Sequence, residues 1–225
     1  MAGTTRTNWF AIWVSVAVVA VVVAVVGVVV WMNNTATDPG TLPEASNIDS
    51  ETGAISVGEG DGTIATYVDF MCPACNAFEQ LYATTLDTLL DDGTATLEIH
   101  PIAILDSRSQ GTEYSTRAAN AMYCVAVEDA DASLPFLRAM YENQPDEGTE
   151  GLTDAAIIDI AAGVGVTGID SCVTDGTYTK YVTAMTPKTP LQEGASGIST
   201  PTVAVNGEVI TLTGVPDTDL TARLK

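Results

Sequence analysis

Positive charge is scarce in this sequence. Its 225 residues include eight lysines and arginines and a single histidine, against 29 aspartates and glutamates, so the formal net charge is −21 at pH 7. Nucleic acids and anionic lipid surfaces bind basic patches, and the composition therefore argues against both as partners. The four cysteines do not have the spacing of a four-cysteine zinc site, so the sequence predicts no metal and no cofactor.

Charge is absent altogether from Trp9 to Met32. As a helix this run would extend roughly 36 Å, enough to cross the hydrocarbon core of a membrane. Tryptophans toward both ends of the run, Trp13 and Trp31 among them, suit the headgroup zone. A cleavable signal peptide is the alternative, but no A-x-A cleavage site follows the run. We therefore expect a transmembrane helix at residues 9–32.

The distribution of lysine and arginine predicts the orientation of this helix. Arg6 precedes it, and no lysine or arginine follows until Arg108. Because positive charge stays on the cytoplasmic side, residues 1–8 are expected in the cytoplasm and the C-terminal part outside, as a single-pass protein of the cell membrane. Disulfides persist in that compartment, in agreement with the even number of cysteines.

Small residues form a seam along the same helix. Ala17, Ala20, Ala24 and Gly27 recur at three- and four-residue steps. Small side chains let a second membrane helix approach closely, which suggests a transmembrane helix partner. Chance is the competing explanation, because the segment consists mainly of valine and alanine.

The sequence after the apolar run divides into a linker and a folded region. Residues 33–53 are polar and contain prolines and glycines, which predicts a flexible linker. The folded region covers residues 54–225. Strands are predicted at residues 54–57, 63–70, 95–102, 202–205 and 208–212, with Asn206-Gly207 as a hairpin turn between the last two. Helices are predicted around residues 118–126, 134–141, 154–162 and 220–224.

Two cysteines stand three positions apart in Cys72-Pro73-Ala74-Cys75. They follow a predicted strand and begin a helical pattern that stops at Gly93, so Cys72 is expected at the first turn of a helix. Backbone N–H groups at that place favour a thiolate, the nucleophilic form of cysteine. Cys75, one turn later, can form a disulfide with Cys72. The arrangement predicts thiol–disulfide exchange.

Two motifs in this order resemble the DsbA-like thioredoxin-fold family, in particular its membrane-anchored actinobacterial members. The first motif runs from Asp69 to Cys75, the second from Ser199 through Pro201 to Gly207, and a helical stretch separates them. The similarity covers roughly residues 55–225. It implies an α/β, thioredoxin-like fold with a helical insertion at about residues 103–176, preceded by the transmembrane helix.

The resemblance also implies a function. The protein would be an extracytoplasmic thiol–disulfide oxidoreductase that forms or isomerises disulfides in exported, unfolded client proteins. Cys72 and Cys75 would be catalytic together with Pro201, and Thr200 and Phe70 would bind the substrate. A membrane partner would re-oxidise the dithiol. The direction of the reaction stays open between oxidase, isomerase and reductase. An accessory subunit of a membrane complex, with little catalytic role, is the alternative.

The residues themselves support a special role for Pro201. If the Thr200–Pro201 bond is cis, the backbone of Thr200 can pair with an extended substrate chain and hold its cysteine over Cys72. A trans proline that opens an edge strand is the alternative.

The chain departs from the family before its first cysteine, and again at Pro187 and Pro190, which shorten the helix expected before the second motif. Many relatives carry a buried acid six positions before the first cysteine, where this chain has Thr66. Asp69 is expected to point to the opposite face of the strand, so it is a poor substitute. His100, the only histidine, is better explained as an ordinary strand-end residue than as a proton relay. No proton shuttle is therefore assigned.

The remaining cysteines, Cys124 and Cys172, lie 48 positions apart. A structural disulfide is the leading interpretation and would contribute about 4 kcal/mol in the loop-closure model. A free buried pair and a second shuttling dithiol are the alternatives.

Overall fold

The structure, a computed structural model, describes residues 9–36 and 39–224 and divides into two compact units. The first unit contains α1 (Trp9–Ala36), a helix of 28 residues. Its segment Ile12–Val29 is apolar, long enough to cross a membrane and not buried. Near an N-terminus a signal sequence has the same features, so α1 is a candidate membrane span. The predicted cytoplasmic segment 1–8 lies outside the described residues.

The predicted seam is exposed on this helix. Ala17, Ala20, Ala24 and Gly27 are all accessible. Around Gly27, nothing lies within 4 Å of the position that a Cβ atom would take. The structure holds a single chain, so a helix partner stays a prediction.

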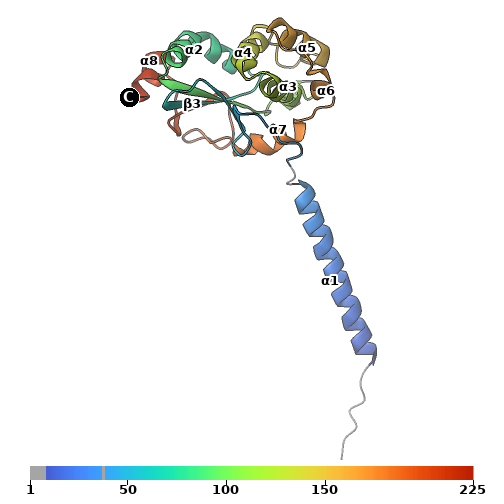
Figure 1. The fold of residues 1–225 in the computed structure, drawn as a ribbon. Helices are drawn as coiled ribbons and strands as arrows, with labels where there is room; N and C mark the ends of the chain where they lie inside the picture. The colour runs from blue at the N-terminus through green and yellow to red at the C-terminus, as the bar shows by residue number, and fades with distance from the viewer. Residues whose placement is uncertain (1–8, 37–38, 225) are drawn as a thin grey trace, which may run out of the picture. The chain divides into compact units, whose positions relative to one another are not determined.

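A six-stranded sheet lies at the centre of the second unit (Figure 1). The strand order is β1-β2-β4-β3-β5-β6, and only β3 and β4 are parallel neighbours. The strands are β1 (Ile48–Asp49), β2 (Ala54–Val57), β3 (Gly62–Val68), β4 (Ala95–Pro101), β5 (Thr202–Val205) and β6 (Glu208–Ile210). Asn206 and Gly207 connect β5 to β6 with positive φ angles of 50° and 81°, which confirms the predicted hairpin turn.

Helices cover both faces of the sheet. α2 (Pro73–Asp91) and α8 (Pro216–Asp219) lie on one face, and α7 (Thr179–Met185) lies on the other (Figure 1). The side chain of Tyr82 on α2 donates a hydrogen bond to the buried carboxylate of Asp219. The sequence predicts a helix at residues 220–224. The structure has α8 before this range, starting at Pro216, which suits the first helical position, and a 3-10 turn at Thr221–Arg223.

The helical insertion separates β4 from β5, as the resemblance implies. It contains α3 (Tyr114–Glu128), α4 (Ser133–Glu142), α5 (Asp154–Gly163) and α6 (Asp170–Thr174), and α7 follows. Helical structure thus continues to Met185, beyond the predicted end at residue 176. The Thr153 hydroxyl caps α5 by accepting a hydrogen bond from the Ala156 N–H at 3.2 Å. Pro187 lies in the 3-10 turn that ends α7, because proline cannot continue a helix.

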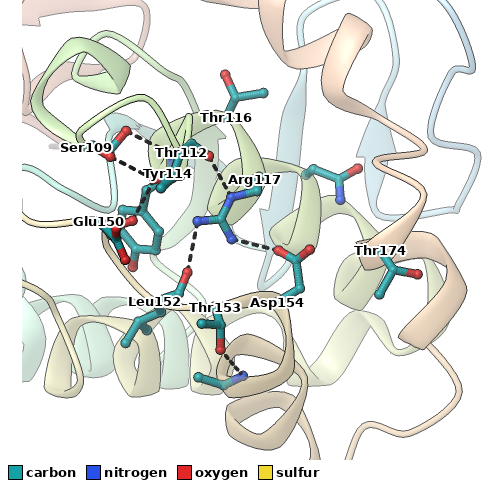
Figure 2. Close-up of polar contacts among 12 residues, drawn as sticks. Ser109, Thr112, Tyr114, Thr116, Arg117, Glu150, Leu152, Thr153, Asp154 and Thr174 are labelled. Atoms are coloured by element: carbon teal, nitrogen blue, oxygen red, sulfur yellow. Dashed lines mark hydrogen bonds and ion pairs between the residues drawn. The ribbon is translucent and has the colours of Figure 1, made fainter.

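Arg117 on α3 ties the parts of the insertion together (Figure 2). Its guanidinium donates to the Thr112 carbonyl at 2.8 Å and to the Leu152 carbonyl at 2.9 Å. A third hydrogen bond reaches the Asp154 carboxylate at the start of α5, at 2.6 Å. One planar group with several donors thereby fixes the loop before α5 against α3.

A disulfide links Cys124 on α3 to Cys172 on α6, with the Cα atoms 6.0 Å apart. The leading interpretation from the sequence is confirmed. Cys72 and Cys75 are the free cysteines.

The prediction of a flexible linker at residues 33–53 is wrong for most of its length. α1 continues to Ala36, and the chain from Pro39 onward belongs to the second unit. β1 pairs with β2, and the Ser50 carbonyl accepts a hydrogen bond from the Tyr181 hydroxyl at 2.8 Å. Polar composition predicts a linker, but this segment is ordered by the neighbouring strand β2 and by Tyr181, which lies 131 positions away.

Candidate active site

The dithiol lies in the turn between β3 and α2. In this turn the Cys72 N–H donates to the Asp69 carbonyl at 3.0 Å. Cys72 is the N-cap residue of α2, with φ −80° and ψ 115°, and Pro73 is the first helical residue. The fixed φ angle of proline suits that position. The prediction that Cys72 stands at the first turn of a helix is confirmed.

The pKa of the Cys72 thiol is lowered from 9.0 to about 6. The largest cause is a hydrogen bond from the Cys75 side chain, and burial opposes it. Thr200 and the backbone amides of Cys75 and Ala74 lower the pKa further. The amides at the helix start therefore contribute as expected, but the neighbouring thiol contributes more. At neutral pH, Cys72 is mostly in its nucleophilic form.

The second sulfur has the opposite property. The Cys75 side chain is 0% exposed, whereas Cys72 is 7% exposed. Burial raises the pKa of Cys75 well above 9.0, and the hydrogen bond and negative charge of Cys72 raise it further. The pair therefore consists of a thiolate that is slightly exposed to solvent and a protonated thiol that is fully buried.

The loop before β5 brings a second segment to the dithiol. The Thr200–Pro201 peptide bond is cis, as the resemblance implies. The Cys72 sulfur lies 3.4 Å from the Thr200 carbonyl oxygen, to which it donates when it is protonated, whereas the Thr200 side chain is the part that lowers the Cys72 pKa. Gln192 holds this loop, because its amide donates to the Pro201 carbonyl at 3.0 Å and to the Thr202 hydroxyl at 3.3 Å. Three of the predicted site residues, Cys72, Thr200 and Pro201, thus meet at one place.

The insertion also contributes to the site, which the sequence does not reveal. The side-chain amide of Gln144, just after α4, donates to the Phe70 carbonyl at 3.0 Å and to the Cys72 carbonyl at 2.9 Å. Asn76 on α2 in turn donates to the Gln144 side-chain oxygen at 3.0 Å and to the Tyr141 carbonyl at 3.0 Å. No motif marks Gln144, because the partners of its side chain lie 68 to 74 positions away and two of them are backbone carbonyls.

Asp69 connects the dithiol turn to the insertion. Its carboxylate is fully buried, and burial raises its pKa. It accepts hydrogen bonds from four donors: the backbone amides of Met71 (2.9 Å), Ile104 (2.8 Å) and Leu105 (3.0 Å), and the Ser115 hydroxyl (2.7 Å). These donors lie mostly in the insertion and its entry loop. Each of the two Asp69 carboxylate oxygens accepts two of these hydrogen bonds.

The prediction that Phe70 binds the substrate is wrong. Its side chain is 0% exposed. Its ring packs against Tyr141 on α4, with the centroids 5.5 Å apart. The insertion therefore covers Phe70, which the sequence next to the cysteines does not indicate.

His100 has a packing role. Its ring is buried and stacks on Tyr67, with the centroids 4.1 Å apart. Burial lowers its pKa to about 4, against a smaller opposite effect of the Thr52 backbone and the Asp49 charge. These neighbours lie outside the dithiol turn, which favours the interpretation of His100 as an ordinary strand-end residue over a role as a proton relay. Within residues 9–36 and 39–224, no three His, Cys, Asp or Glu side chains are grouped to hold a metal ion.

Comparison with known proteins agrees with this geometry. The family model described as Thioredoxin matches residues 52–219, which include strands β2 to β6, both free cysteines and the cis-proline loop. Among curated proteins, the serine/threonine-protein kinase PknE of Mycobacterium tuberculosis is 34% identical over 143 residues, or 61% of this chain. The match covers 25% of the kinase, so the chain spans about a quarter of the length of the curated relatives it matches.

Two solved structures from Mycobacterium tuberculosis match most of the second unit. Reduced DsbA is 31% identical with a TM-score of 0.63, and the match covers 72% of this chain and 86% of DsbA. The reduced disulfide bond oxidoreductase DsbG is 29% identical with a TM-score of 0.62, over 82% of this chain and 86% of DsbG. This chain belongs to the thioredoxin family, and its fold is that of the DsbA-like thiol–disulfide oxidoreductases.

Proposed function

We propose that this chain is a thiol–disulfide oxidoreductase that acts through Cys72 and Cys75. The main support is the contrast between the two sulfurs beside the cis Thr200–Pro201 bond. Cys72 has a pKa of about 6, and burial raises the pKa of Cys75 well above 9.0. One sulfur is available for exchange as a thiolate, and the other stays protonated while the enzyme is reduced.

The proposed reaction begins with the oxidised dithiol. A client thiolate attacks the Cys72 sulfur, the Cys72–Cys75 bond breaks, and Cys75 leaves as a thiolate that takes up a proton. A second client thiolate then attacks the client sulfur of the mixed disulfide. The client leaves with a disulfide, and Cys72 leaves as a thiolate.

The acidity of Cys72 favours the oxidising direction. A stabilised thiolate stabilises the reduced enzyme and so makes the disulfide a stronger oxidant. The pKa of about 6 lies between about 7 for thioredoxin and about 3.5 for DsbA. We therefore expect a reduction potential between those of the two proteins, and the oxidase as the first choice over isomerase and reductase.

Thr200 is the proposed substrate-binding residue. Its carbonyl lies 3.4 Å from the Cys72 sulfur, so a client strand that pairs with the Thr200 backbone would carry its own cysteine to the same place. Strand addition of this kind depends on main-chain hydrogen bonds and accepts many client sequences.

We further infer that α1 anchors the enzyme in the cell membrane, with residues 1–8 in the cytoplasm and the second unit outside. The apolar segment Ile12–Val29 supports the anchor. Arg6 before this segment and the absence of lysine and arginine up to Arg108 support the orientation. The Cys124–Cys172 disulfide suits an oxidising compartment. The clients would be exported, unfolded proteins, and a membrane partner would re-oxidise the dithiol.

Trapping of mixed disulfides tests the proposal. In the full chain, Cys75→Ala leaves Cys72 able to attack but removes the thiol that releases bound clients. We expect adducts with many exported proteins that disappear on reduction. Cys72→Ala is the matched control and should trap none. A Cys75→Ala protein that forms no adducts, but one stable stoichiometric complex, would contradict the enzyme and favour the accessory subunit.

A further inference from the structure

The exchange reaction places a negative charge on a buried sulfur. When the Cys72–Cys75 bond breaks, Cys75 leaves with the bonding electrons, and its side chain is 0% exposed. Water cannot solvate that charge well, and an uncompensated buried charge is costly. Thr66 stands at the position of the family's buried acid, and the Asp69 carboxylate is occupied by four other donors. Burial raises the pKa of Cys75 more than the Asp69 backbone amide and the Thr200 side chain lower it, and a further donor beside the sulfur would stabilise the leaving thiolate more strongly.

Tyr141 on α4 is the group that reaches this place. Its side chain is 3% exposed and lies against Phe70 in the dithiol turn. Its hydroxyl donates to the Asp69 carbonyl, and at 3.4 Å this hydrogen bond is long. The Asp69 backbone amide is also a hydrogen-bond partner of Cys75. The Tyr141 hydroxyl and the Cys75 sulfur therefore lie beside the same residue, and the charge of Cys75 adds to the effect of burial in raising the pKa of Tyr141.

The position of Tyr141 is fixed from two sides. Asn76, the residue after Cys75, donates from its side chain to the Tyr141 carbonyl at 3.0 Å. The backbone N–H of Gln144 donates to the same carbonyl at 3.2 Å, and the Gln144 side chain holds the Cys72 carbonyl. The C-terminal end of α4 and the first turn of α2 thus form one hydrogen-bonded unit. The backbone of Tyr141 is thereby fixed beside the dithiol turn, and only its hydroxyl has to rotate when the sulfur becomes charged.

We propose that the Tyr141 hydroxyl, supplied by the helical insertion, is the hydrogen-bond donor that stabilises the Cys75 thiolate as it leaves Cys72. This inference rests on the proposed function. In the reduced enzyme the hydroxyl donates to the Asp69 carbonyl, and as the S–S bond breaks it turns toward the Cys75 sulfur. Tyr141 keeps its proton, because burial raises its pKa well above 10.0. Cys75 then takes a proton from water, which balances the proton that the client thiol has lost.

The inference predicts a kinetic effect with little change in equilibrium. Charge on Cys75 occurs in the transition state for opening the disulfide and also in the reverse step, where Cys75 attacks the mixed disulfide. The end states contain either a disulfide or a neutral Cys75 thiol. Loss of the hydroxyl should therefore slow both directions by the same factor, about 10-fold for one charge-assisted hydrogen bond.

The test compares Tyr141→Phe with Tyr123→Phe in the full chain in detergent. Tyr123 is equally buried, but its hydroxyl donates to the Gly53 carbonyl at 2.8 Å, in the segment between β1 and β2. Reduced glutathione opens the oxidised dithiol, and the reverse rate is that at which Cys75 releases glutathione from Cys72. We expect both rates to fall about 10-fold in Tyr141→Phe, with an equilibrium constant within about 2-fold of wild type, and wild-type rates in Tyr123→Phe.

Each other outcome overturns one particular claim. Wild-type rates in Tyr141→Phe, or a shift in equilibrium without slowing in both directions, would overturn the role of the hydroxyl while leaving the proposed function intact. A wild-type enzyme whose Cys72 forms no mixed disulfide with glutathione would overturn the proposed function and this role with it. If Tyr141→Phe does not resist proteolysis as the wild type does, Tyr141→Leu, which also lacks the hydroxyl, takes its place with the same expected rates.

Discussion

The acidity of Cys72 depends on its neighbour Cys75, and this dependence can be measured. Cys75→Ala removes the hydrogen bond that contributes most to the low pKa of about 6. A hydrogen bond to a charged group contributes about 1.5–3 kcal/mol, and one pKa unit corresponds to about 1.36 kcal/mol. We therefore expect the Cys72 pKa to rise by about one to two units in Cys75→Ala. At pH 7 the thiolate fraction would fall from roughly nine-tenths to a half or less.

The pH dependence of iodoacetamide alkylation measures this pKa. Cys124 and Cys172 are joined in a disulfide, so Cys72 is the reacting thiol in the variant. Cys75→Ser is the matched control, because its hydroxyl keeps a donor at the same place, and its Cys72 pKa should stay within about half a unit of wild type. If Cys75→Ala and Cys75→Ser titrate alike, the backbone amides at the start of α2 control the acidity and the reasoning is refuted.

Three further predictions concern stability, measured by pulse proteolysis of the full chain in urea. In Asp69→Asn, an NH2 group replaces a carboxylate oxygen that accepts two backbone hydrogen bonds in the wild type. Each donor left without an acceptor lowers the free energy of unfolding by about 1–3 kcal/mol. A decrease of less than about 1 kcal/mol would contradict this role of Asp69. Replacing Cys124 and Cys172 by alanine should cost about 4 kcal/mol for a 48-residue separation; an unchanged urea midpoint would count against this. Arg117→Met should lower the free energy of unfolding by more than about 1 kcal/mol, which is more than loss of a surface ion pair costs. The reason is that the Thr112 and Leu152 carbonyls and the Asp154 carboxylate all lose the same donor.

Where the sequence pattern is local, it predicts the structure well. The helix that starts after Cys72 follows from Pro73 and from apolar residues at helical spacing, and both are present in α2. The β5–β6 hairpin follows from Asn206-Gly207, since both residues adopt the positive φ angles that this turn requires. In each case a few consecutive residues contain the information.

The wrong predictions concern segments whose surroundings come from distant parts of the chain. Residues 39–53 are polar, yet they belong to the second unit because β1 pairs with β2 and Tyr181 binds the Ser50 carbonyl. Phe70 adjoins the reactive turn, yet Tyr141 on α4 covers its ring. Composition and adjacency predict neither the Tyr181 contact nor the Tyr141 contact, because both come from helices more than 70 positions further along the chain.

The sequence by itself determines the dithiol, its position at a helix start and the proline loop expected to face it, because these follow from short motifs with known backbone preferences. Only the tertiary structure decides which groups surround the two sulfurs. Gln144 and Tyr141 reach the dithiol turn from 65 or more positions away, and nothing in their local sequence marks them. They have these roles because α4 packs against α2. The C-terminal end of α4 then supplies hydrogen-bond donors to a site that is buried away from water.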